Sequence, residues 1–284
     1  KRQGSFRGVK VLIQEGNLMM ARYPAVMAGW SVPLPTVVDT VLTALAPAMP
    51  DRIPAAHMGT LGGALVFFGN DPKTGRGFVL QTIEGGGWGG RPWEDGESGS
   101  VSVCQGDVRN APIENIELKT PVIIEQRALR PDSGGPGKYR GGLGMATTAR
   151  NLIEGRWNLS RGQGREQCLP WGLWGGKPGA RPDSFLQRPG EPALQPIEAQ
   201  RILVPANSRA AIWVAGGGGW GDPFQRDPAV VAADVLDGLV SLQSARDDYG
   251  VVIDPVTMTM DLPATEATRR AIPDPRPYTP IPRH

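Results

Sequence analysis

Cysteine and histidine are both scarce in this chain of 284 residues. The two cysteines, Cys104 and Cys168, exclude a disulfide framework and allow one bridge at most. This low content favours a reducing, cytoplasmic location. The two histidines, His57 and His284, are too few for a histidine-rich metal site built from this chain alone. A lone histidine such as His57 is more often structural than catalytic, and its sequence leaves both roles open.

An excess of charge and long apolar runs are also missing. Thirty basic residues stand against 28 acidic ones, and the resulting charge of +2 is spread without a basic face. We therefore expect neither nucleic acid nor a membrane surface as a partner. No apolar run approaches the roughly 18 residues of a membrane span, and the first residues lack the apolar core of a signal peptide.

Glycine is what the chain has in excess. It accounts for 39 of 284 residues, about 14%, and 28 prolines accompany it. The usual glycine content is roughly 7%. Because the glycines form short motifs between apolar runs, they predict tight turns in a β-rich domain. The predicted fold class is α+β, with β-rich mixed sheets, many glycine-rich loops and a few amphipathic helices.

Periodicity places the expected elements. Short apolar runs predict strands at residues 8–13, 65–68, 78–83, 122–129, 150–153, 157–160, 202–205 and 210–214. The turn sequence 70–75 makes the second and third of these a hairpin. A core helix is predicted from the apolar stripe Val37, Val38, Val41, Leu42 and Leu45, with Thr36 as N-cap and Pro47 as the stop.

The C-terminal part of the chain predicts a helix pair followed by a tail. Asp227 and Ser241 are the expected N-caps of two helices within residues 227–250. From Pro255 the sequence becomes polar and rich in proline. We therefore interpret residues 254–284 as an extended tail and residues 1–253 as one domain.

Three loops are candidates for function. Residues 130–144 read Arg-Pro-Asp-Ser-Gly-Gly-Pro-Gly-Lys-Tyr-Arg-Gly-Gly-Leu-Gly, a specified loop rather than a helix or central strand. A second loop begins at Glu84, Gly85, Gly86 and Gly87, where consecutive amides could form an anion-binding nest; the alternative is a flexible turn. A third polar loop contains Arg109 and Asn110. The residues named in the second and third loops are the predicted substrate-binding residues: Glu84, Gly85, Gly86, Gly87, Arg109 and Asn110.

Nucleotide motifs are absent or weak. Residues 216–221 satisfy G-x-G-x-x-G formally, but Asp222 and Pro223 prevent a helix from starting directly after the glycines, as a dinucleotide site requires. No G-x-x-x-x-G-K-[ST] motif occurs. We expect this chain to bind no ATP by itself.

Several motifs, in one order along nearly the whole chain, resemble the hydantoinase B family. This family includes the B-type subunits of ATP-dependent hydantoinases, 5-oxoprolinases and lactamases, and related subunits of acetone and acetophenone carboxylases. The matching stretches are 85–92, 95–98, 109–114, 130–144, 170–173, 175–176, 216–223 and 227–251.

The resemblance implies a divided enzyme. Family members are about twice as long, so residues 1–253 resemble their C-terminal half, either cleaved or separately encoded. The resemblance places a divalent metal, Zn or Mn, in the N-terminal half, and ATP with Mg on a partner ATPase subunit of the hydantoinase A type. It implies that this chain alone binds neither. The expected partners are that ATPase, the N-terminal half of the B-type subunit and a small-molecule substrate.

The implied activity is that of a subunit in an ATP-dependent multi-subunit enzyme. ATP would phosphorylate a hydantoin, lactam or other cyclic amide, and Arg130, Lys138 and Arg140 would contact the anion. Asp132 is expected to fix the loop, and the alternative for the whole loop is a structural clasp between strands.

Two other functions stay open. Many hydrolases of the family have Gly-Thr-Met-Asn-Asn where this chain has Gly-Thr-Leu-Gly-Gly at 59–63, and Thr-Asn-Thr-Arg-Asn-Thr-Pro where it has 106–112. The loss of carboxamides favours a subunit of a ketone carboxylase of the acetone or acetophenone type. The other alternative is a non-catalytic scaffold subunit.

Overall fold

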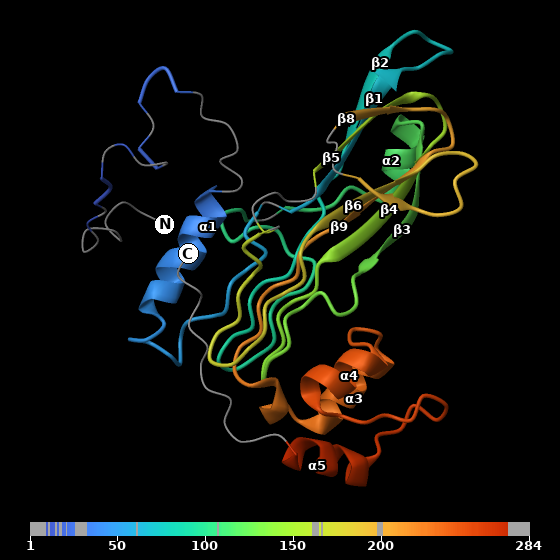
Figure 1. Ribbon diagram of the computed structural model, residues 1–284. Coiled ribbons are helices and arrows are strands. Elements are labelled where there is room, and N and C mark those ends of the chain that lie inside the picture. Colours follow the sequence, from blue (N-terminus) through green and yellow to red (C-terminus); the bar gives the residue numbers. More distant parts are fainter. Residues whose placement is uncertain are drawn as a thin grey trace. The chain divides into compact units, whose positions relative to one another are not determined.

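The computed structural model describes residues 33–271 apart from 61, 107, 161–164, 166 and 198–200 (Figure 1). It also describes residues 10, 12–14, 16, 19–20 and 22–25. Internal contacts divide the chain into Lys1–Trp30 and Ser31–His284. All helices and strands of the described residues belong to the second unit. Half of the strand predicted at 8–13 lies outside the described residues.

Two antiparallel sheets form the β-rich part of this unit. The first has the order β2-β1-β5-β8 and the second the order β3-β4-β9-β6-β7. The strands are β1 (Ala64–Asn70), β2 (Gly77–Gln81), β3 (Val122–Leu129), β4 (Met145–Asn151), β5 (Gly155–Ser160), β6 (Asp183–Gln187), β7 (Gln195–Pro196), β8 (Arg201–Val204) and β9 (Arg209–Trp213). All pairs of these strands are antiparallel, and parallel pairing occurs among the described residues as the isolated bridge Leu173–Trp220.

The main core is shared by the two sheets. Alternate residues of both sheets point into it, which is the expected period of two for a half-buried strand. Its largest buried side chains are Phe67 and Trp157, whose ring centroids lie 4.7 Å apart. The α+β class is therefore confirmed.

Most of the predicted strands are also confirmed. The hairpin forms as expected, because the Asp71 carboxylate accepts hydrogen bonds from the Lys73 amide and the Thr74 hydroxyl in the turn. β4 begins at Met145 rather than at residue 150, and β6 was not predicted. Both strands are rich in polar residues, and their neighbours in the sheet hold them in place.

Helices occur in two groups. α1 (Pro33–Leu45) and α2 (Ile113–Lys119) precede the larger sheet, and α3 (Pro228–Leu236), α4 (Leu242–Tyr249) and α5 (Leu262–Arg270) follow it. α2 was not predicted; its seven residues follow Pro112 at the N-cap position. No helix in the described part of the chain is long and apolar enough to cross a membrane.

The N-caps predicted for the C-terminal pair are confirmed. The Asp227 carboxylate accepts from the Ala229 amide, and the Ser241 hydroxyl accepts from the Ser244 amide. α5 lies within residues 254–284, so this part of the expected tail is helical rather than extended. Residues 272–284 lie outside the described residues. The proposed domain boundary at residue 253 stays a prediction.

α1 differs from its prediction in the face it buries. It begins at Pro33, so Thr36 lies inside the helix and is not its N-cap. Val41 and Leu45 of the predicted stripe are 54% and 40% exposed, whereas Asp39 is 1% exposed. Charged partners elsewhere in the fold bind this carboxylate, and they determine which face of α1 is turned inward.

Extended glycine-rich segments run side by side in the middle of Figure 1. We call residues 53–60, 84–90, 133–144, 170–180 and 214–221 the glycine bundle. Backbone hydrogen bonds join these segments although none of them is a regular strand. The glycines that suggested tight turns therefore form a second core, built from backbone rather than side chains.

The segment around Gly218 lies at the centre of the bundle. Its three consecutive amides donate to three different segments: Gly217 to Gly142, Gly218 to Ala56 and Gly219 to Lys177. The carbonyls of the same three residues accept from Gly135, Gly90 and Leu173. Because the partner changes at every residue, this one segment is hydrogen-bonded to three neighbouring segments at once.

Glycine is required here because there is no room for a side chain. A Cβ atom on Gly217 would lie 2.0 Å from the Trp88 carbonyl oxygen, and one on Gly87 would lie 1.8 Å from that of Gly142. The obstructing atoms belong to backbone and cannot rotate away. The same argument explains the glycines at the axis of the collagen triple helix.

We predict that Gly217→Ala destabilises the protein by about 3 kcal/mol or more. The added methyl group would push neighbouring backbone segments apart and break the hydrogen bonds between them. Gly106→Ala is the matched control, since nothing lies within 4 Å of its Cβ position. Denaturant titration of both variants measures the change. Small and equal losses of stability in the two variants would contradict the proposal that Gly217 has no room for a side chain.

Candidate functional site

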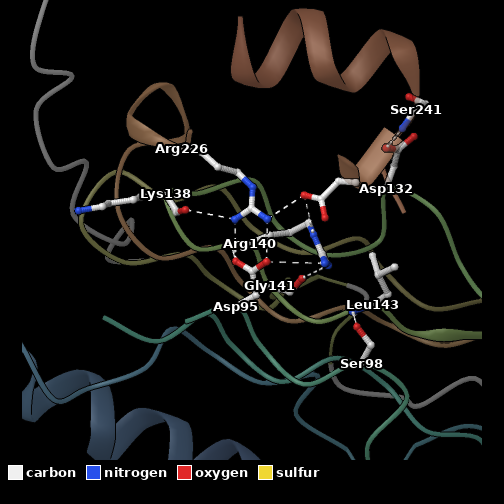
Figure 2. A network of polar contacts seen from close by, with 10 residues as sticks. Asp95, Ser98, Asp132, Lys138, Arg140, Gly141, Leu143, Arg226 and Ser241 are labelled. Carbon is white, nitrogen blue, oxygen red and sulfur yellow. Dashed lines mark hydrogen bonds and ion pairs between the residues drawn. The ribbon is translucent and has the colours of Figure 1, made fainter. Parts of the chain in front are cut away.

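A largely buried network of ion pairs joins the predicted loop 130–144, through Arg140, to Asp95, Arg226 and Asp234 (Figure 2). Arg226, which follows the short 3-10 helix η2 (Pro223–Gln225), binds both carboxylate oxygens of Asp95, at 2.6 and 2.7 Å. Its Nη2 also donates to Asp234 of α3 at 2.7 Å. Burial lowers the pKa of Arg226, but the hydrogen bonds and charge of Asp95 outweigh this effect and raise it, so the guanidinium stays protonated.

Arg140 belongs to the same network. Its backbone amide donates to Asp95 at 2.7 Å, its Nη1 donates to the Gly141 carbonyl at 2.9 Å, and its Nε lies 3.6 Å from Asp234. Two arginines thus face two aspartates, and their formal charges cancel. This geometry supports a structural role for Arg140 rather than contact with an anion, because the network fastens the loop to α3.

The other three candidates in the loop are separate from one another. Asp132 accepts a hydrogen bond from the Ser241 amide at 2.8 Å, at the start of α4 and away from the arginines (Figure 2). The Lys138 carbonyl accepts from Arg226, while its ammonium group points away from the network (Figure 2). Arg130 lies over the Trp213 ring and donates to the Arg181 carbonyl, and burial lowers its pKa.

A cavity of about 370 Å³ lies beside the network. Asp95, Lys138, Tyr139 and Arg226 are among the residues that line it. Of the predicted catalytic candidates, Lys138 is therefore the one that combines an exposed side chain with a cavity.

The predicted substrate-binding residues fall into two places. Glu84 is fully buried and binds Arg127 and the Thr147 hydroxyl, each at 2.8 Å. The amides of Gly86 and Gly87 donate to the carbonyls of Ser100 and Ala215, so they are engaged within the protein, and a Cβ on Gly85 would meet backbone at 2.0 Å. Arg109 and Asn110 are exposed and precede α2.

A second polar cluster surrounds His57. Its Nδ1 lies 2.6 Å from Oδ1 of Asp39 on α1, and the other oxygen of Asp39 accepts from Arg165 at 2.5 Å. Asp39 and Arg165 are 1% and 0% exposed. The Trp88 ring meets the imidazole at 82° with a centroid distance of 5.4 Å, and Arg165 stacks on Trp171 at 4.6 Å.

Sequence reasoning missed Asp39 and Arg165. Asp39 interrupts the apolar stripe of the predicted helix, and this mismatch was the available signal. The sequence contains no comparable signal for Arg165, because this residue lies 126 positions away from its partner Asp39. The tertiary fold alone brings the two together.

These residues do not fit a divalent metal. No group of three or more histidine, cysteine or acidic side chains among the described residues could hold an ion. Asp39 and His57 supply two donors, and the Arg165 cation beside them opposes a second positive charge. We therefore assign no metal chemistry to this cluster.

We predict that Arg226→Met destabilises the protein by about 3–5 kcal/mol, because it leaves Asp95 and Asp234 without their strongest partner. Arg270→Met is the control, since that arginine forms an exposed pair with Glu266 and should cost less than about 1 kcal/mol. Denaturant midpoints of the two variants test this difference, and a minor effect of Arg226→Met would refute it.

The network also predicts an alkaline sensitivity. Tyr249 packs beside it with 1% exposure, and burial raises the pKa of its phenol above the ordinary value of 10.0. Above pH 10 the unfolded chain loses this proton while the native state keeps it. The free energy of unfolding therefore falls by about 1.4 kcal/mol per pH unit from this group.

Tyr249→Phe should remove that part of the alkaline loss and change little at neutral pH, because the hydroxyl has no hydrogen-bond partner within the described structure. Tyr23→Phe, at a position 99% exposed, is the control. Urea titrations at pH 8 and pH 11 measure the effect. Parallel pH profiles for wild type and Tyr249→Phe would contradict it.

Comparison with known proteins gives the chain its relatives. A family model described as hydantoinase B/oxoprolinase matches residues 1–223. The beta subunit of the caprolactamase of Pseudomonas jessenii is 32% identical over 283 residues, covering 95% of this chain and 47% of that protein. The putative B-type subunit of a D-/L-hydantoinase from a Pseudomonas strain is 29% identical, covering 88% of this chain and 41% of that protein.

Solved structures agree with these matches. The crystal structure of the ATP-dependent caprolactamase from Pseudomonas jessenii contains a chain with a TM-score of 0.80 and 31% identity, covering 92% of this chain and 46% of that one. A nucleotide-free acetone carboxylase structure shares the fold, with a TM-score of 0.63 and 22% identity over 77% of this chain and 33% of that one. The chain spans less than half the length of these relatives. It belongs to the hydantoinase B/oxoprolinase family.

Proposed function

We propose that this chain is the C-terminal half of a hydantoinase B-type subunit in an ATP-dependent, multi-subunit amidohydrolase. Its substrate is a hydantoin, lactam or other cyclic amide, activated by phosphorylation on a partner ATPase subunit. The observation that carries the proposal is the similarity to caprolactamase, which extends over 92% of the chain in structure and 95% in sequence. The cytoplasm is the proposed location.

The placement of ATP on a partner is supported by the glycine bundle. Residues 216–221 formally match a dinucleotide motif, but the amides of Gly217, Gly218 and Gly219 donate to other segments of the protein. A phosphate would need those amides free. We accordingly propose that ATP with Mg is bound by a hydantoinase A-type subunit. A divalent metal would belong to the N-terminal half of the B-type subunit.

Within this chain, we propose that the bundle supplies a rigid wall of a shared active site. His57 and Lys138 are its candidate functional side chains, since the imidazole of His57 contacts the buried Asp39 carboxylate and Lys138 borders a cavity. The packing seen around Arg140, Asp132, Glu84 and Gly85–Gly87 supports a structural role for them. Arg109 and Asn110 remain candidates for substrate contact.

One observation favours the ketone carboxylase as a second candidate. Gly62 has a φ of +116° and its Cβ position lies 2.2 Å from the Glu84 carbonyl oxygen. This backbone cannot accommodate the asparagine that many hydrolases of the family have at the corresponding place. A carboxamide for orienting a cyclic amide is therefore missing here.

We predict that the complex purified with its natural partners converts ATP to ADP when a cyclic amide is added, and forms the ring-opened carboxylic acid. Caprolactam, hydantoin and 5-oxoproline serve as probes. Acetone or acetophenone with ATP and ¹⁴C-bicarbonate tests the second candidate, since only a carboxylase places the label in a β-keto acid. Stable assembly with turnover of neither class would support the scaffold and reject both enzymes.

A further inference from the structure

Three polar side chains from distant parts of the sequence meet at His57. Asp39 lies on α1, His57 follows 18 positions later in the glycine bundle, and Arg165 lies 126 positions beyond Asp39. Two of the three are formally charged and nearly inaccessible to solvent. Because burying charge is costly unless it is paired, this convergence is a specified feature of the fold.

The charges determine how the imidazole is protonated. Arg165 forms an ion pair with one oxygen of the Asp39 carboxylate, and the other oxygen faces His57. An ionised carboxylate accepts hydrogen bonds only, so the Nδ1 atom of His57 must carry a proton to donate across the 2.6 Å contact. In the neutral ring, Nε2 then has a free lone pair. Asp39 thus selects the tautomer in which Nε2 can accept a proton.

The ring is also held in one orientation. The backbone amide of His57 donates to the same Asp39 oxygen at 3.3 Å, and Trp88 packs against the ring almost at right angles. The side chain of His57 keeps 8% of its surface exposed, compared with 1% for Asp39. Because Nδ1 faces the Asp39 carboxylate, Nε2 lies on the side of the ring that is turned away from Asp39.

Within the described structure, Arg165 is held by two contacts. Its Nη2 donates to Asp39, and its guanidinium stacks on Trp171 at 4.6 Å. Gly59 makes room for this guanidinium, because a Cβ there would lie 1.8 Å from Nε.

We propose that His57 is the proton acceptor of the reaction, with Asp39 and Arg165 as its positioning residues. This inference rests on the proposed function of the chain as part of a cyclic amide hydrolase. As a water oxygen bonds to the amide carbon, one water proton moves to Nε2, and Asp39 offsets the charge of the imidazolium. The imidazolium returns that proton to the ring nitrogen of the phosphorylated substrate as the carbon–nitrogen bond breaks, which restores neutral histidine. The proton of the added hydroxyl passes to the released amine, and a second water hydrolyses the resulting acyl phosphate to carboxylate and phosphate.

The tautomer can be tested without turnover. The chain has two histidines, so ¹⁵N-histidine labelling of the untagged protein gives two ring systems, and His284→Gln identifies the other one. We expect His57 to be protonated on Nδ1 and not on Nε2, and Asp39→Asn to abolish this preference. An Nε2-protonated ring in the wild-type protein would overturn the inference by itself.

The catalytic role is tested in the complete complex with its partners, ATP and a cyclic amide. In His57→Asn the amide nitrogen can still donate to Asp39, but the proton acceptor is lost. We expect kcat to fall at least about 100-fold with little change in KM, and imidazole to restore part of the turnover of His57→Ala. His284→Ala is the matched control and should keep wild-type activity.

The outcomes separate this inference from the proposed function. If the wild-type complex hydrolyses the cyclic amide and His57→Asn does so equally well, His57 is not the proton acceptor and the proposed function stands. If the wild-type complex has no such activity, the proposed function fails and the catalytic role of His57 fails with it. Melting temperatures of both variants identify any loss caused by unfolding, and a normal melting temperature with lost activity supports the inference.

Discussion

The close packing of backbone against backbone in the glycine bundle is the constraint on which the rest of the structure depends. Three consecutive amides around Gly218 donate to three different segments, and neighbouring glycines leave no space for a Cβ atom. Hydrogen bonds in several directions replace the side-chain interlocking of an ordinary core. Such packing tolerates no side chain, and it explains why the chain contains about twice the usual proportion of glycine.

Both polar clusters are anchored to this bundle. The Arg226 network joins the bundle loop at Arg140 to α3, and the His57 cluster joins the bundle to α1. At α1 the ion pair adds to apolar packing, in which Leu42 and Ala46 lie in one cluster with Ile53, Ala55 and Leu173. The two polar clusters differ in composition. Asp95 and Asp234 are matched by two arginines, whereas Asp39 is shared between Arg165 and the imidazole of His57.

This difference changes the meaning of the most prominent sequence motif. The loop 130–144 has three cations and looked suited to an anion, yet Arg140 is neutralised, Arg130 is stacked on Trp213 and Asp132 binds the start of α4. Backbone contacts restrict the sequence of the loop, because a Cβ atom on Gly134, Gly135, Gly141 or Gly142 would collide with neighbouring backbone. The residue proposed as proton acceptor lies elsewhere, at His57, whose sequence context indicated nothing unusual.

The sequence by itself determined the local features of this protein. Strand β3, the β1–β2 hairpin and the caps at Asp227 and Ser241 depend on alternation and turn chemistry within a few residues, so they could be predicted. The tertiary structure decided what the glycines do, which face of α1 is buried and which charges pair. Asp39 meets Arg165 across 126 positions, and Asp95 meets Arg226 across 131. No local pattern contains such a pairing, because its energy arises only when the bundle brings distant segments into contact.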